Sequence, residues 1–194
     1  MQKTKIKISF FGVLMLLALI FTHSYISLAA LFAAAIHEIG HILAAKMCAI
    51  PIRELKLDIF GASLSTNTAL YSYKKEIFLA AAGPIANILS ALILYPILKS
   101  SSSFGQLFIA ASLFLGILNL LPISDFDGGR ITRCIMCEIF SHSTACRICE
   151  VLSLVSVICL WLLSVYLLLL RASSLSLFVF SLSLFFKLFI RQKN

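Results

Sequence analysis

Charged residues are scarce in this sequence, and acidic residues are the scarcest. Only 12% of the 194 residues are charged and only eight are Asp or Glu, whereas about a quarter of a typical soluble domain is charged. The chain is instead 61% hydrophobic, with a mean hydropathy of +1.04. This composition excludes an ordinary soluble domain and predicts a single membrane-embedded domain over residues 1–194 that crosses the bilayer several times.

The sequence also lacks a basic helix and any alternation of aromatic with basic residues. Its net charge of +8 is therefore not explained by nucleic acid, and we expect no nucleic-acid partner. A disulfide framework is not expected either, because five of the six cysteines fall in regions predicted to be cytosolic. Two C-x-x-C pairs leave a second metal site open, although the absence of turn glycines favours coincidental thiols; the pairs are Cys134, Cys137, Cys146 and Cys149.

Long apolar runs define the expected membrane spans, which cover residues 8–21, 26–47, 77–98, 104–121, 148–170 and 175–190. The basic start could indicate a signal peptide, but the apolar character resumes at once, so we expect a first transmembrane helix and no soluble domain. Fourteen of the sixteen Lys and Arg residues lie in alternate connections, which places both termini in the cytosol. Lys187, near the end of the last span, is expected to extend toward the membrane surface.

Residues 52–62 follow a different period. Leu55, Leu57 and Ile59 alternate with Lys56 and Asp58, which is typical of a strand, and residues 63–73 offer a return strand. The expected fold is thus an all-α polytopic membrane protein with about six transmembrane helices and a small β-hairpin after the second. The hairpin would expose a sheet edge for an extended peptide, and an amphipathic loop is the alternative.

The second span contains His37-Glu38-Ile39-Gly40-His41. Side chains four residues apart share one helix face, so both imidazoles can reach one ion, and this is the zinc-hydrolase arrangement. Glu38 could hold and deprotonate a water molecule. Packed structural histidines are the alternative, but ionisable groups are costly in hydrocarbon and usually mark a functional site.

A catalytic zinc needs a third protein ligand. The segment that follows the fourth span contains Pro122, Asp125, Asp127 and Gly128-Gly129, which favour a sharp irregular turn with two carboxylates. Asp127 or Asp125 is the natural third ligand, and a solvated acidic turn is the alternative. The charge pattern brings this segment to the same membrane side as the end of the second span. Asn87 is interpreted as a helix–helix hydrogen bond in preference to a substrate contact.

Three motifs taken together resemble the site-2 proteases, which are intramembrane zinc metalloproteases. The motifs are residues 37–41, Ala82-Gly83-Pro84-Ile85-Ala86-Asn87, and Asn119-Leu120-Leu121-Pro122 through Asp127-Gly128-Gly129-Arg130. The resemblance implies that His37, His41 and Asp127 bind zinc, that Glu38 is the general base, and that Asn119 and Pro122 hold substrate.

The predicted topology looks most like the stage IV sporulation protein FB branch. Phe126 stands where members commonly have Leu, and the C-terminal nucleotide-sensing domain of that branch is missing from this sequence. The missing domain weakens the link to ATP control and to sporulation.

The expected function is a zinc endopeptidase in a bacterial cell membrane that cleaves a membrane-tethered protein near the cytosolic face. The substrate would be a transcription factor precursor or a signal-peptide remnant, with a membrane regulatory partner. The alternatives are an inactive substrate-binding pseudoprotease and a metal transporter. The intact motif argues against the first, and the absence of internal repeats argues against the second.

Overall fold

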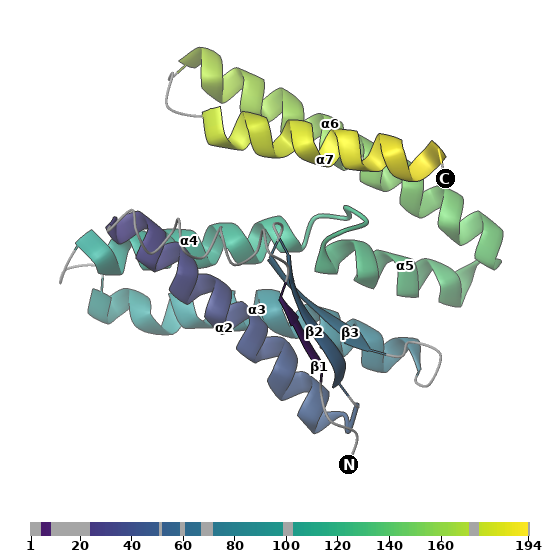
Figure 1. Ribbon diagram of the computed structural model, residues 1–194, viewed down its shortest axis with the longest axis horizontal. Coiled ribbons are helices and arrows are strands. Elements are labelled where there is room, and N and C mark those ends of the chain that lie inside the picture. The colour runs from purple at the N-terminus through teal and green to yellow at the C-terminus, as the bar shows by residue number, and fades with distance from the viewer. Residues whose placement is uncertain are drawn as a thin grey trace. The chain divides into compact units, whose positions relative to one another are not determined.

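The computed structural model describes residues 5–8, 24–50, 52–58, 61–66, 72–98, 103–170 and 175–193 (Figure 1). The chain divides into two compact units, residues 1–120 and 121–194. The predicted first span, residues 8–21, lies outside the described residues except for Ile8. The described part contains six helices and one small sheet. A single domain over the whole chain stays a prediction.

Three mutually packed helices form most of the first unit. They are α2 (Tyr25–Met47), α3 (Tyr73–Leu98) and α4 (Ser103–Asn119). The Ser24 side chain caps α2 by accepting a hydrogen bond from the Ile26 amide at 3.2 Å, which satisfies one of the free donors of the first turn. The core between the helices combines small and bulky residues, namely Ala29, Ala33, Ala91, Phe108 and Ile109.

Helices α2 and α3 touch backbone to backbone. A Cβ atom added to Gly40 would lie 2.6 Å from the Ala82 carbonyl oxygen and 2.8 Å from the Ala86 Cβ. Both distances are too short for a real side chain, so only glycine permits this approach. Small residues at such crossings are typical of helices that associate in lipid.

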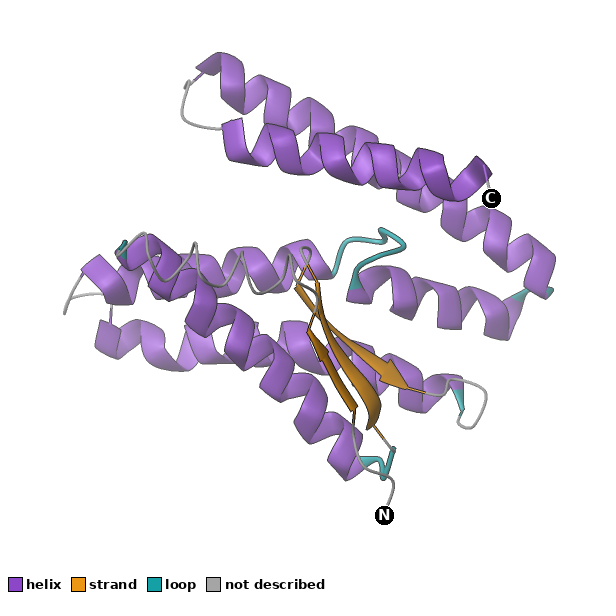
Figure 2. Cartoon of the chain, in the orientation of Figure 1, coloured by secondary structure: helices purple, strands orange, loops and turns teal. Residues whose placement is uncertain are grey.

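The sheet belongs to the first unit and has the strand order β1-β2-β3 (Figure 2). Strand β2 (Ile52–Asp58) lies where the alternating pattern predicted a strand, and it pairs antiparallel with β3 (Gly61–Thr66), which begins and ends earlier than the return strand expected over residues 63–73. Strand β1 (Lys5–Ile8) pairs parallel with β2, and this strand was not predicted from the sequence. Both β1 and β3 are therefore edge strands.

The second unit consists of α5 (Asp127–Ile139), α6 (His142–Leu170) and α7 (Leu175–Lys193). Helix α6 packs on both neighbours, and the buried hydroxyls of Ser164 and Ser181 link it to α7 at 3.0 Å. Helix α6 begins six residues before the predicted start of the fifth span, because the helix continues through the polar residues that precede the apolar run.

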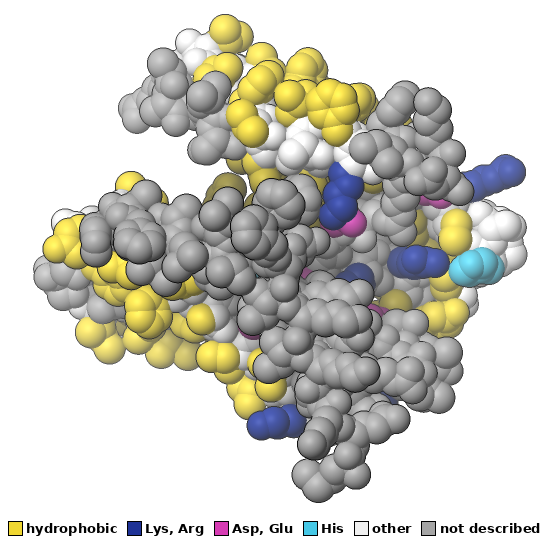
Figure 3. Space-filling model, viewed as in Figure 1, with side chains coloured by type: hydrophobic (Ala, Val, Ile, Leu, Met, Phe, Trp, Pro, Cys, Tyr) yellow, Lys and Arg dark blue, Asp and Glu magenta, His cyan; other side chains and the backbone are white. Residues whose placement is uncertain are grey.

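Several helices carry exposed apolar side chains of the kind expected on a surface that faces lipid. Helices at 25–47, 73–97 and 142–170 are long and apolar enough to cross a membrane, and α4 and residues 177–188 of α7 are shorter apolar helices. Leu92 is 61% exposed and Leu169 is 82% exposed, and Figure 3 shows hydrophobic side chains on the visible surface of both units. The helical architecture is confirmed and is consistent with a membrane fold, while the number of passes and their orientation stay predictions.

The contact at Gly40 gives a first testable prediction. We expect Gly40→Val to destabilise the protein by about 1–3 kcal/mol, because the new side chain must push α3 away or distort α2. The measurement is thermal unfolding of the purified protein in detergent. Ala34→Val on the exposed face of α2 is the matched control and should change the midpoint little, and equal midpoints for the two variants would contradict the prediction.

Candidate metal centre

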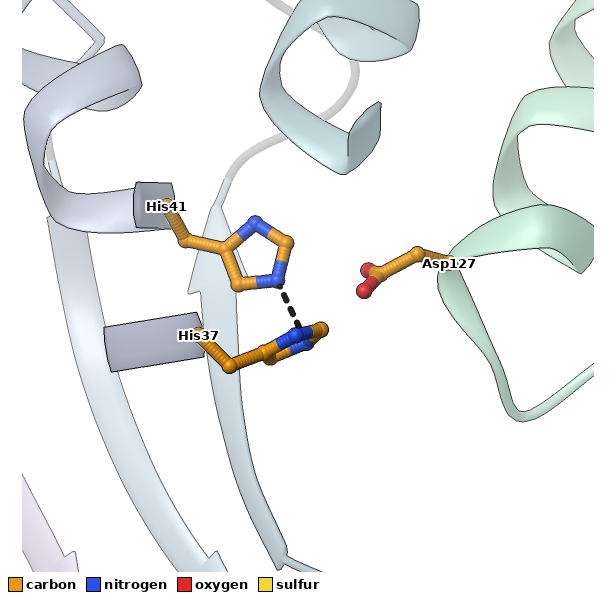
Figure 4. A group of neighbouring side chains, drawn as sticks. All are labelled: His37, His41 and Asp127. Atoms are coloured by element: carbon orange, nitrogen blue, oxygen red, sulfur yellow. Dashed lines mark hydrogen bonds between the residues drawn. The ribbon is translucent and has the colours of Figure 1, made fainter. Parts of the chain in front are cut away.

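Two buried histidines lie one turn apart on α2. His37 is 6% exposed and His41 is 5% exposed. Their Nε2 atoms are 3.2 Å apart, and the two rings meet edge to face with centroids 4.8 Å apart (Figure 4). The four-residue spacing therefore directs both imidazoles toward one point, as the sequence predicted.

The neighbouring helix fixes the tautomer of His41. Its Nδ1 atom lies 2.8 Å from the Leu79 carbonyl oxygen of α3. A carbonyl oxygen only accepts hydrogen bonds, so Nδ1 carries the proton and donates it. In the neutral ring Nε2 then keeps a lone pair, which is the form that binds a metal.

Asn87 of α3 plays the corresponding part for His37. Its Nδ2 atom is 3.3 Å from His37 Nδ1, so the interpretation of Asn87 as a helix–helix hydrogen bond is confirmed. Asn87 is wholly buried, and its Oδ1 has no hydrogen-bond partner among the described residues. In this orientation the amide donates to Nδ1, and the His37 Nε2–H donates to His41. Turning the amide over would let Oδ1 accept from Nδ1–H and would free the His37 Nε2 lone pair.

The pair fits a zinc ion by distance and by available space. Zinc–nitrogen bonds of about 2.0–2.1 Å in a tetrahedral site separate two ligand atoms by about 3.3–3.4 Å, close to the 3.2 Å between the Nε2 atoms. Gly83 of α3 leaves the imidazoles room, because a Cβ there would collide with His41 Nε2 and lie 2.9 Å from His37 Cε1. Glu38 follows His37 on α2 and is half-buried.

The two candidate carboxylates of the second unit differ in their surroundings. Asp127 is the first residue of α5 and only 7% exposed, and its Oδ1 is 3.3 Å from Arg130 Nη1; Figure 4 also draws its side chain. Asp125 is exposed, and its Oδ2 pairs with Lys187 Nζ at 3.2 Å. Lys187 thus pairs with this carboxylate, while its extension toward the membrane surface stays a prediction.

The turn before Asp127 depends on Gly129. A Cβ at Gly129 would collide with the carbonyl oxygen of Ile123, so the chain can fold back over α5 only where glycine stands. The Phe126 amide donates to the same carbonyl oxygen at 2.9 Å. The sequence signalled this turn through its proline and its glycine pair.

The two residues predicted to hold substrate have ordinary surroundings. Asn119 ends α4, and its Nδ2 donates to the Leu115 carbonyl oxygen of the same helix at 3.0 Å. Pro122 is half-buried in the turn after that helix. No substrate is present to test either residue, so both roles stay predictions.

The cysteines of α5 and α6 are all free thiols. His142 lies between two of them, with Nδ1 3.9 Å from Cys137 Sγ and Nε2 3.8 Å from Cys146 Sγ. Within the described ranges these residues do not bring three donor atoms together around one point. A second metal site therefore gains no support from the geometry.

Comparisons with known proteins agree with the fold and the motif. The model of peptidase family M50 matches residues 25–108 and 98–163, and the chain belongs to this family of zinc metalloproteases. No curated protein sequence matches the chain. Among solved structures, the site-2 protease from Methanocaldococcus jannaschii is similar in fold, with a TM-score of 0.65 and 21% identity over 94% of this chain and 88% of that one. The sporulation branch suggested by the predicted topology is not confirmed by these matches.

Gly83 offers a test of the space around the imidazoles. We expect Gly83→Ala to lower the zinc content of the purified protein, because the new methyl group occupies the position next to His41 Nε2. The measurement is zinc by mass spectrometry, with the unfolding midpoint followed in parallel. Ala81→Ser, a change at a half-buried position on the same helix, is the control, and full zinc content in Gly83→Ala would show that the space is not needed.

Asn87 offers a test of the tautomer. We expect Asn87→Leu to weaken zinc binding about 10–100-fold, the usual cost of losing an outer partner of a histidine ligand. Asn87→Asp should bind more tightly than Asn87→Leu, because a carboxylate accepts the Nδ1 proton of His37. Competition with a chromogenic chelator measures both affinities, and equal affinities for the two variants would argue against the role.

Proposed function

We propose that the chain is an intramembrane zinc metalloendopeptidase that cleaves a membrane-embedded protein substrate near the cytosolic face. One observation carries this proposal. Two buried imidazoles present Nε2 atoms 3.2 Å apart inside a helix apolar enough to cross a membrane, in a chain of peptidase family M50. Hydrolysis inside a bilayer needs such a site, because water and charge must be held there against the hydrocarbon.

The proposed zinc ligands are His37, His41 and Asp127. Each is buried and each offers one ligand atom, and two imidazoles with one carboxylate form a known set for catalytic zinc. Both Asp125 and Asp127 take part in an ion pair, and burial favours Asp127, because it is 7% exposed whereas Asp125 is exposed.

In the proposed reaction the zinc ion and the protein side chains have different roles. A bound zinc supplies a Lewis acid that polarises a carbonyl group and makes a water molecule more acidic. Glu38 accepts a proton from that water and then delivers it to the nitrogen of the leaving amine. Asn119 and Pro122 hold the substrate backbone, and an edge of the sheet pairs with the extended substrate segment.

The substrate must unwind before it is cut. A transmembrane helix keeps its carbonyl oxygens in internal hydrogen bonds, so helix-breaking residues near the cut site should speed cleavage. The candidate substrates are membrane-tethered transcription factor precursors and signal-peptide remnants of a bacterial membrane, controlled by a regulatory membrane partner. Both termini of the protease lie in the cytosol in this proposal.

Glu38→Gln tests the proposed reaction. We expect the variant to keep its zinc and to lose about 10²–10⁴-fold in cleavage rate, because the amide cannot accept the proton. Co-expression with candidate substrates, followed by detection of the product fragment, measures cleavage. Glu138→Gln on the exposed surface of α5 is the control and should cleave at the wild-type rate.

Three results would count against the proposal. Undiminished cleavage by Glu38→Gln would remove Glu38 from the role of base. Failure of the wild type to cleave any candidate while it retains zinc would favour a pseudoprotease. Uptake of zinc into vesicles without proteolysis would favour a transporter.

A further inference from the structure

Three consecutive residues lead into Asp127, and each is held by a different contact within the second unit. The Ser124 amide donates to Ser153 Oγ of α6 at 3.0 Å. The other two are held by α7, since Asp125 pairs with Lys187 at 3.2 Å and the Phe126 ring stacks on Phe180, with centroids 6.4 Å apart and an angle of 9°. We call residues 121–126 the Asp127 loop.

Contacts with α6 and α7 matter for this loop because the first turn of α5 lacks a polar N-cap residue, even though glycine shapes the turn itself. Phe126 occupies the N-cap position with extended backbone angles, and its side chain makes no capping hydrogen bond. Polar N-cap residues normally fix the first turn of a helix. The direction in which Asp127 leaves the first turn of α5 therefore depends on what holds the preceding loop.

Helix α7 presents one face that can hold the Asp127 loop. Phe180, Leu184 and Lys187 recur at intervals of four and three residues, so they share one side of the helix. Leu184 is 2% exposed, and the Ser164–Ser181 hydrogen bond fixes α7 on α6 independently of the loop. The face that contacts the loop thus belongs to a docked helix, and its two loop contacts can be removed without removing the docking.

We propose that α7 positions the Asp127 loop, with Lys187 and Phe180 as positioning residues that hold the Asp127 carboxylate in its metal-binding orientation. This rests on the proposed function, in which Asp127 is a zinc ligand. Neither residue touches the ion or the substrate in this proposal. Their loss should loosen one ligand of three and leave the imidazole pair unchanged.

The decisive experiment measures zinc release from the full-length protein in detergent under excess chelator. We expect Lys187→Met and Phe180→Leu each to release zinc about threefold faster, in line with the modest strength of partly exposed ion pairs and single ring contacts. The double variant should release it about tenfold faster. In Co²⁺-substituted protein the visible absorption band should weaken in the same order, since it reports the coordination geometry.

Matched controls separate positioning from general damage. Lys74→Met on α3 and Phe186→Leu on α7 change exposed residues of the same types and should release zinc at the wild-type rate. The exchange Asp125→Lys with Lys187→Asp restores the ion pair in reverse and should release zinc more slowly than Lys187→Met. Rescue of this kind would not follow from a merely structural role for either side chain.

The outcomes distinguish this inference from the proposed function. Wild-type release by the double variant, together with fast release by Asp127→Ala, would overturn the positioning role and leave the zinc site standing. Absence of zinc from the wild type would overturn the site itself. If the Phe180 variants fail to fold, comparison of Lys187→Met with the charge exchange decides alone, and equal release by those two would overturn the inference.

Discussion

The close approach of α2 and α3 is the constraint on which the rest of the first unit depends. Gly40 lets the two backbones meet, and Gly83 keeps the space beside the imidazoles open. Only at this separation can the Leu79 carbonyl oxygen and the Asn87 amide reach across to the histidine rings. Lipid gives no hydrophobic drive to such a contact, so close packing and these polar bonds must hold the helices together.

The same contact explains how polar groups persist among apolar helices. Each Nδ1 atom of the pair has a partner on α3, which offsets much of the cost of burying an imidazole. If the Asn87 amide is turned over, both Nε2 atoms carry lone pairs that repel each other across 3.2 Å. A cation bound by both would offset that repulsion, and the Asn87 Oδ1, which has no partner among the described residues, would accept from the His37 Nδ1–H.

Local spacing accounts for what the sequence predicted well. His37 and His41 are brought together by helix geometry alone, and the alternation of residues 55–59 located β2 because strand period is also local. Contacts between residues far apart in the sequence were harder to predict. Strand β1 pairs in parallel with a distant segment, and its Lys-Ile alternation spans only four residues beside a long apolar run, which is too short to predict a strand. Lys187 resembles any lysine at the end of a span, and its pairing with Asp125 arises only when α7 and the loop meet.

The proposed ligands are therefore held in two different ways. The imidazoles belong to α2, and the close contact between α2 and α3 at Gly40 holds this helix in place. The carboxylate follows a loop whose contacts with α6 and α7 are an ion pair, a ring stack and one hydroxyl bond, each worth little alone. Of the three proposed ligands, Asp127 is then the one whose position depends most on α7. A change in the packing of α7 would act on the metal through this residue and leave the histidines in place.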